Sequence, residues 1–121
     1  KAITINLYSH ADVVAKITDP TRVSAVVSFL NARRDRWYDP RGGLFGAASD
    51  IDLLDSKGRS VAFISFGGGG LYQSRPTKTF VDSDGYELAL ARTGPPDETQ
   101  HDADALCALL GGTFRHETCE Y

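Results

Sequence analysis

Residues 19–36 read DPTRVSAVVSFLNARRDR and carry the clearest structural signal in the chain. Asp19 can accept a hydrogen bond from an unpaired backbone N–H as a helix N-cap, and Pro20 suits the first helical position because its missing N–H is not needed there. Apolar residues follow at the spacing of one helix face: Val23, Val26, Val27 and Leu30. The stretch predicts an amphipathic helix that packs its apolar stripe on a hydrophobic surface.

Short segments rich in β-branched residues surround this helix and predict antiparallel strands. Segments 2–8 and 13–18 are separated by a short polar break, which suits a hairpin. Segments 51–55 and 59–66 are joined by a turn that contains Gly58, and glycine adopts a left-handed turn conformation at little cost. The second of these strands is apolar on both faces, which predicts a central position in the sheet.

The second half of the chain continues the same pattern. Four consecutive glycines, 67–70, break a strand that resumes at 71–73. Segment 77–91 reads as a further hairpin, and segment 97–110 has apolar positions at helical spacing. Gly111 and Gly112 end that helix, and the residues that follow give no clear pattern.

Together these elements predict one two-layer α+β domain over residues 1–121. Its antiparallel sheet would have five to six strands and carry both helices on one face, in the order ββαββββα. The helix stripes would cover four sheet residues: Ile51, Leu53, Val61 and Phe63.

The charge balance and the lengths of the apolar runs exclude two classes of protein. Thirteen Lys and Arg against sixteen Asp and Glu give a net charge of −3, whereas a nucleic-acid-binding domain needs a basic surface. No apolar run approaches the ~20 residues that cross a bilayer. We therefore expect neither a nucleic-acid partner nor a membrane span.

The cysteines and the start of the chain bear on its compartment. Cys107 and Cys119 are an even pair, which predicts one disulfide. The chain begins at Lys1 and contains no methionine, which fits removal of a signal peptide. We expect a periplasmic or secreted protein, with a cytoplasmic one as the alternative because two buried thiols are ordinary there.

No catalytic, metal or cofactor motif is complete. His116-Glu117 begins like a zinc-protease HExxH, but Glu120 stands at the second histidine position. The segment 82–85 with Glu87 lacks the ligand spacing of a calcium loop and predicts a hairpin turn. The sequence therefore predicts no catalytic residue, no metal ligand and no cofactor.

Two segments are candidates for contact with a partner protein. The first is an arginine-rich segment with aromatic residues, and the second is the glycine loop with the residues that follow it. The candidate residues are Arg33, Arg36, Trp37 and Arg41 in the first segment and Gly68, Gly69, Tyr72 and Arg75 in the second. The structural alternatives are charges that complement a helix C-terminus, with Trp37 packed on the core, and a plain turn between two strands.

The order of features resembles small exported bacterial α+β domains over most of the chain. The resemblance is carried by the Asp19-Pro20 helix start, Trp37 after that helix, the Gly58 hairpin and a closing helix that ends in Leu109-Leu110-Gly111. Some such domains are enzyme inhibitors or immunity proteins against toxins. The resemblance implies a non-enzymatic protein-binding domain. The alternative is a small-ligand-binding or catalytic domain with a pocket between sheet and helices.

Overall fold

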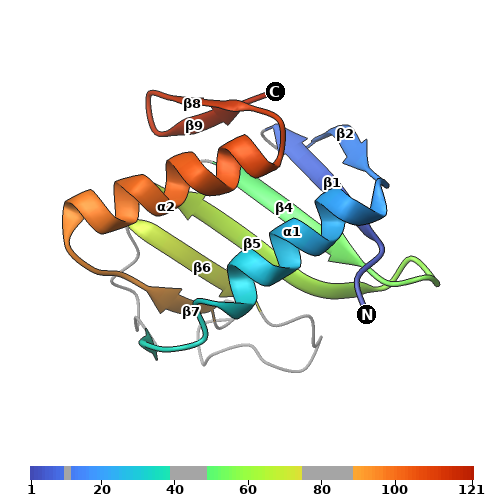
Figure 1. Cartoon of the computed structure of the whole chain (residues 1–121), viewed down its shortest axis with the longest axis horizontal. Helices are drawn as coiled ribbons and strands as arrows, with labels where there is room; N and C mark the ends of the chain where they lie inside the picture. The colour runs from blue at the N-terminus through green and yellow to red at the C-terminus, as the bar shows by residue number, and fades with distance from the viewer. Residues whose placement is uncertain (10–11, 39–48, 75–88) are drawn as a thin grey trace, which may run out of the picture.

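Two helices pack on one face of an antiparallel sheet in the computed structural model, which describes residues 1–9, 12–38, 49–74 and 89–121 (Figure 1). The predicted α+β class is therefore confirmed. The elements are β1 (Thr4–Ser9), β2 (Asp12–Ile17), α1 (Pro20–Asn31), β3 (Trp37–Tyr38), β4 (Ser49–Leu54), β5 (Ser60–Gly67), β6 (Gly70–Ser74), β7 (Ala89–Arg92), α2 (Pro96–Leu109), β8 (Thr113–Arg115) and β9 (Thr118–Glu120). The first arm and turn of the hairpin predicted at 77–91 lie outside the described residues.

Seven strands form the main sheet, in the order β2-β1-β4-β5-β6-β7-β3, with each pair antiparallel. This is more than the five or six predicted. The strand that sequence patterns miss is β3, whose two residues pair with β7 across Trp37 and Arg92. Two residues are too few to show an alternating pattern. As predicted, β5 lies near the middle of the sheet.

Helix α1 begins as the sequence predicts. The Asp19 carboxylate accepts a hydrogen bond from the Thr21 N–H at 3.3 Å, and Pro20 occupies the first turn. Val23 and Val26 are buried against the sheet, whereas Val27 is only half-buried. In the described residues, neither α1 nor α2 has the length and apolar character that a membrane-crossing helix needs.

The core lies between the helices and the sheet, and one predicted part of it is wrong. Ile64 and Phe66 of β5 face the helices and are buried, whereas Val61 is exposed and Phe63 contacts Tyr8 on the other face of the sheet. The error has a physical cause. Because β5 is apolar at both odd and even positions, its sequence does not show which set faces the helices.

A small second sheet, β8-β9, follows α2 and lies beside its C-terminal end (Figure 1). The predicted disulfide is confirmed: it joins Cys107 on α2 to Cys119 on β9, with their Cα atoms 5.6 Å apart. The Cys119 N–H donates to the Ser49 hydroxyl at 2.7 Å, and the Gly68 N–H donates to the Glu117 carboxylate at 2.9 Å. The hairpin is thus fixed to α2, β4 and the turn between β5 and β6.

Candidate functional site

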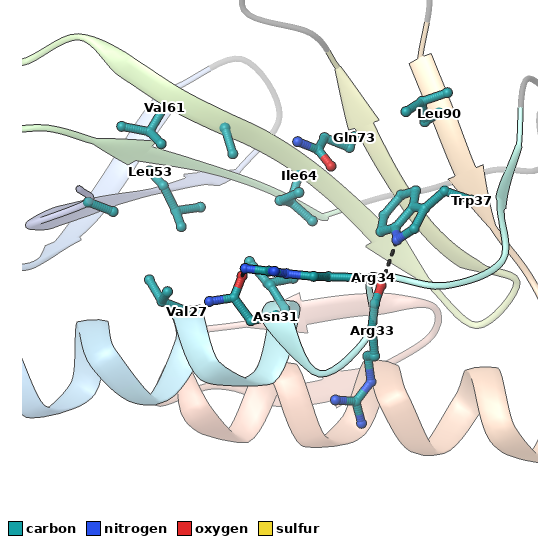
Figure 2. A pocket seen from close by; sticks show the side chains of 13 residues that line it. Val27, Asn31, Arg33, Arg34, Trp37, Leu53, Val61, Ile64, Gln73 and Leu90 are labelled. Carbon is teal, nitrogen blue, oxygen red and sulfur yellow. Dashed lines mark hydrogen bonds between the residues drawn. The ribbon is translucent and has the colours of Figure 1, made fainter.

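A pocket of about 460 Å³ opens between the C-terminal half of α1 and the sheet (Figure 2). Its floor consists of side chains from two neighbouring rows, which together involve four strands. Leu53 pairs with Ala62 across β4 and β5, and Ile64 pairs with Gln73, which in turn pairs with Leu90. The floor is therefore apolar except for one amide.

The small side chain of Ala62 helps to explain why the pocket is there. Its neighbours on this face, Leu53 and Ile64, have larger branched side chains that rise further above their strands. Above the floor, Val27 and Leu30 of α1 form the opposite wall, and both are half-buried rather than buried. The helix is closely packed at Val23 and Val26 and leaves a gap nearer its C-terminus.

Trp37 forms one end of the pocket. Its indole Nε1–H donates to the backbone carbonyl of Arg33 at 2.6 Å, drawn as a dashed line in Figure 2. The ring's one polar group is thereby satisfied, and the rest of the ring offers an apolar surface to the pocket. The pairing of β3 with β7 fixes the backbone of Trp37 in this position.

The polar residues Asn31 and Arg34 lie at the mouth of the pocket. Both are exposed, and an Arg34 guanidinium N–H donates to the Asn31 side-chain carbonyl at 3.2 Å. Figure 2 shows the Arg34 side chain extended through the space between α1 and the sheet, with its guanidinium beside Asn31. None of the described residues that line the pocket carries a carboxylate.

Of the predicted partner-binding residues, Arg33 and Trp37 line this pocket. Arg33 points its guanidinium the other way, however, to form an ion pair with Asp102 of α2 at 2.9 Å, and it lies 3.6 Å from the centre of the Phe29 ring. It also donates to the Phe29 carbonyl at 2.9 Å, so its charge complements the end of α1. Arg33 therefore meets the pocket mainly through its backbone and stem.

Arg36 lies outside the pocket, in a left-handed conformation with φ of 65°, and pairs with Glu98. The hydrogen bond from Arg36 lowers the pKa of Glu98 below its usual value. Nearby, the buried Arg92 forms ion pairs with Asp102 at 3.2 Å and with Asp35 at 3.5 Å. Two of the cations predicted to face a partner, Arg33 and Arg36, are thus paired with carboxylates of the same chain.

The predicted glycine segment forms a tight turn between β5 and β6. Gly68 is half-buried because the Glu117 side chain lies against it, whereas Gly69 is exposed. Tyr72 is 6% exposed and pairs with Ser65 on the sheet face away from the helices. The structure does not bring these residues to the pocket.

Two predicted partner-binding residues, Arg41 and Arg75, lie outside the described residues. Sequence reasoning missed Ala62 and Gln73 as site residues, and the only local signal was a small residue inside an apolar strand. It also gave no sign that Asp102 and Arg92 would pair, because neither belongs to a motif.

The candidate site is therefore an apolar pocket with one tryptophan wall and one cationic group at its mouth. In the described residues, no group of three His, Cys, Asp or Glu side chains is placed to hold a metal ion. Comparison of the chain with protein-family models, with curated proteins and with solved structures finds no match.

Proposed function

We propose that this domain binds a small, largely apolar molecule in the pocket between α1 and the sheet. One observation carries the proposal: a space of about 460 Å³ is walled by aliphatic side chains and Trp37. Small-molecule sites in proteins commonly have volumes of about 300–1,000 Å³, an apolar lining and few polar groups. The pocket has all three properties.

Close packing elsewhere in the molecule supports this proposal. Protein interiors leave few voids larger than a water molecule, and Val26 and Ile51 on either side of the core are fully buried. The gap under Val27 and Leu30 departs from that packing. An apolar ligand placed there would gain about 25 cal/mol for each Å² of apolar surface removed from water.

Trp37 gives a direct readout because it is the only tryptophan in the chain and lines the pocket. Titration with octanol or decanol should change its fluorescence in a saturable way. Ala62→Leu, which adds bulk to the floor, should weaken binding by about tenfold. Ala108→Leu is the matched control, since Ala108 is exposed on α2 and does not line the pocket. No saturable change in the parent, or equal binding by Ala62→Leu, would contradict the proposal.

A second proposal keeps the protein-binding role, as an inhibitor or immunity protein for another bacterial protein. It is supported by two exposed apolar side chains on the edge strand β2, Val13 and Val14, which are 43% and 53% exposed. Once a partner is isolated, Val13→Lys, Val14→Lys or Trp37→Ala should weaken the complex by more than about 1 kcal/mol in at least one case. Equal affinity in three folded variants would contradict it.

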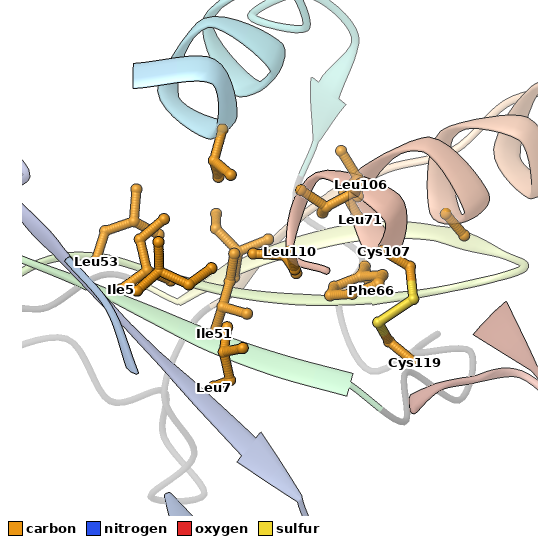
Figure 3. Packing of buried hydrophobic residues seen from close by; sticks show 14 of the residues in the cluster. Ile5, Leu7, Ile51, Leu53, Phe66, Leu71, Leu106, Cys107, Leu110 and Cys119 are labelled. Atoms are coloured by element: carbon orange, nitrogen blue, oxygen red, sulfur yellow. A yellow bond between two sulfur atoms is a disulfide. The ribbon is translucent and has the colours of Figure 1, made fainter. Parts of the chain in front are cut away.

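We further propose that the domain works in an oxidising compartment, the periplasm or the exterior of the cell, rather than in the cytoplasm. The Cys107–Cys119 disulfide supports this, since such bonds persist mainly in oxidising environments (Figure 3). Protein isolated from its native cells and denatured without reductant should show no free thiol. Two free thiols would overturn the proposal.

A further inference from the structure

We propose that the ligand of the pocket is an amphipathic monocarboxylate, an aliphatic or aryl-aliphatic acid whose carboxylate is bound by Arg34 and Asn31. This inference rests on the proposed ligand-binding function and names the chemistry of its ligand. The apolar part of the acid would lie along the floor against Ala62 and Ile64. The carboxylate would lie at the mouth, where water can reach it.

Arg34 differs from several other arginines in its ion pairing. Several other arginines in the described residues have a carboxylate within 4.0 Å: Arg33, Arg36, Arg59 and Arg92. Arg34 has no such carboxylate in the described part of the chain, and the partner of its guanidinium is the neutral amide of Asn31. Among the described residues, therefore, no carboxylate pairs with this positive charge at the mouth of an apolar pocket.

Arg34 and Asn31 also have free hydrogen-bonding capacity for a carboxylate. A guanidinium has five N–H donors in a planar fork that fits a carboxylate with two parallel hydrogen bonds. One donor of Arg34 goes to the side-chain carbonyl of Asn31, which leaves the others available. With its carbonyl engaged, Asn31 still has its amide N–H donors to offer the same anion.

The end of α1 does not oppose an anion as strongly as a bare helix C-terminus would. The carbonyls of Ser28 and Leu30 accept hydrogen bonds from the backbone N–H groups of Ala32 and Arg33. The Phe29 carbonyl accepts from the Arg33 guanidinium. Since these carbonyls are paired, the partial negative charge that would repel a carboxylate there is reduced.

The lining also disfavours other ligand classes. A cation would be repelled by Arg34 and would find no carboxylate among the described lining residues. A strongly polar ligand would leave its groups unpaired over Leu53, Ile64 and Leu90, because the floor offers only the Gln73 amide. An apolar body with one anionic end fits both parts of the site.

Matched ligand pairs that differ only in the head group test the inference: octanoate against octanol, and decanoate against decanol. With Trp37 fluorescence as the readout, the parent should bind each acid at least about tenfold more tightly than its alcohol. Arg34→Gln should remove that preference and leave alcohol binding unchanged. Arg22→Gln, an exposed arginine on the same helix that does not line the pocket, should keep it. Added salt should reduce the preference of the parent.

The outcomes separate the two proposals. If alcohols bind and acids bind no better, or if Arg34→Gln retains the preference, the carboxylate inference is wrong and the ligand-binding function stands. If no member of either series binds the parent, both are wrong. Urea unfolding of each variant shows that a change in binding does not come from loss of the fold.

Discussion

At the scale of single residues, the least expected feature is a buried cation. Arg92 is 6% exposed and lies against Asp102, which is 5% exposed and also accepts a hydrogen bond from Arg33 at 2.9 Å. Burying a charge is costly unless an opposite charge and hydrogen bonds compensate for it. The two arginines come from β7 and from the residues after α1, so Asp102 joins both to α2.

Asp102→Asn should therefore reduce the free energy of unfolding by about 3 kcal/mol, because it leaves two guanidinium groups short of their shared carboxylate. Urea denaturation measures the change. Asp104→Asn is the control: Asp104 lies on the same helix, is exposed and forms no ion pair in the described residues, so its effect should stay within about 0.5 kcal/mol. Equal midpoints for the two variants would show that the network is not stabilising.

Residue-level prediction from the sequence succeeded where the physics is local. The Asp19 cap and the turn at Gly58, with φ of 76°, depend on neighbours within a few residues. The ion pair between Asp102 and Arg33 could not be predicted in this way, because the two residues are 69 positions apart along the chain. The two cysteines were predictable because two cysteines allow only one intramolecular pair.

At the scale of elements, α1 shows what a hydrophobic pattern predicts and what it leaves undetermined. The spacing of its apolar stripe predicted the helix and its covered face, both of which the structure contains. The stripe did not show that its first half packs tightly at Val23 and Val26 while Val27 and Leu30 border a pocket. That difference depends on the side chains below the helix, among which Ala62 is small.

Val26→Ala should reduce the free energy of unfolding by about 2 kcal/mol, since it removes two methyl groups from a fully buried site and leaves a cavity. Val27→Ala makes the same chemical change one position later, and it should reduce the free energy of unfolding by less than about 1 kcal/mol because that side chain borders the pocket. Because both variants lose the same two methyl groups, each serves as the control for the other when their urea unfolding is compared. A larger loss for Val27→Ala would mean that the stripe is centred there and the pocket is closed.

At the scale of the whole molecule, the candidate pocket is built from residues of α1, β3, β4, β5, β6 and β7. No one of these segments has a motif, so the site appears only when the sheet order brings them together. Trp37 was predicted as a partner-binding residue and does line the pocket, but the arginines beside it mostly form ion pairs within the fold. Contacts between segments far apart in the sequence determine both the place of Trp37 at the pocket and the ion pairs of the arginines.

The C-terminal hairpin is the other feature that needs the whole molecule. Its strands, β8 and β9, have three residues each, which is too short for an alternating pattern. Tertiary contacts hold it instead, since Phe114 lies with its ring centre 6.4 Å from that of the buried Phe66. Figure 3 shows the Cys107–Cys119 bond beside Phe66, where it links the hairpin to the core.

Reduction of this disulfide should lower the free energy of unfolding by about 3 kcal/mol, because the bond closes a short loop that the reduced unfolded chain is free to open. Urea denaturation with and without reductant measures it, and Cys107→Ala with Cys119→Ala provides a version that cannot reoxidise.

Hydrogen exchange should become faster in β8 and β9 on reduction and stay slow in β4 and β5, which the sheet holds independently. Ligand affinity should not change, since neither cysteine lines the pocket. Unchanged stability on reduction would show that the Ser49 and Glu117 hydrogen bonds suffice to hold the hairpin.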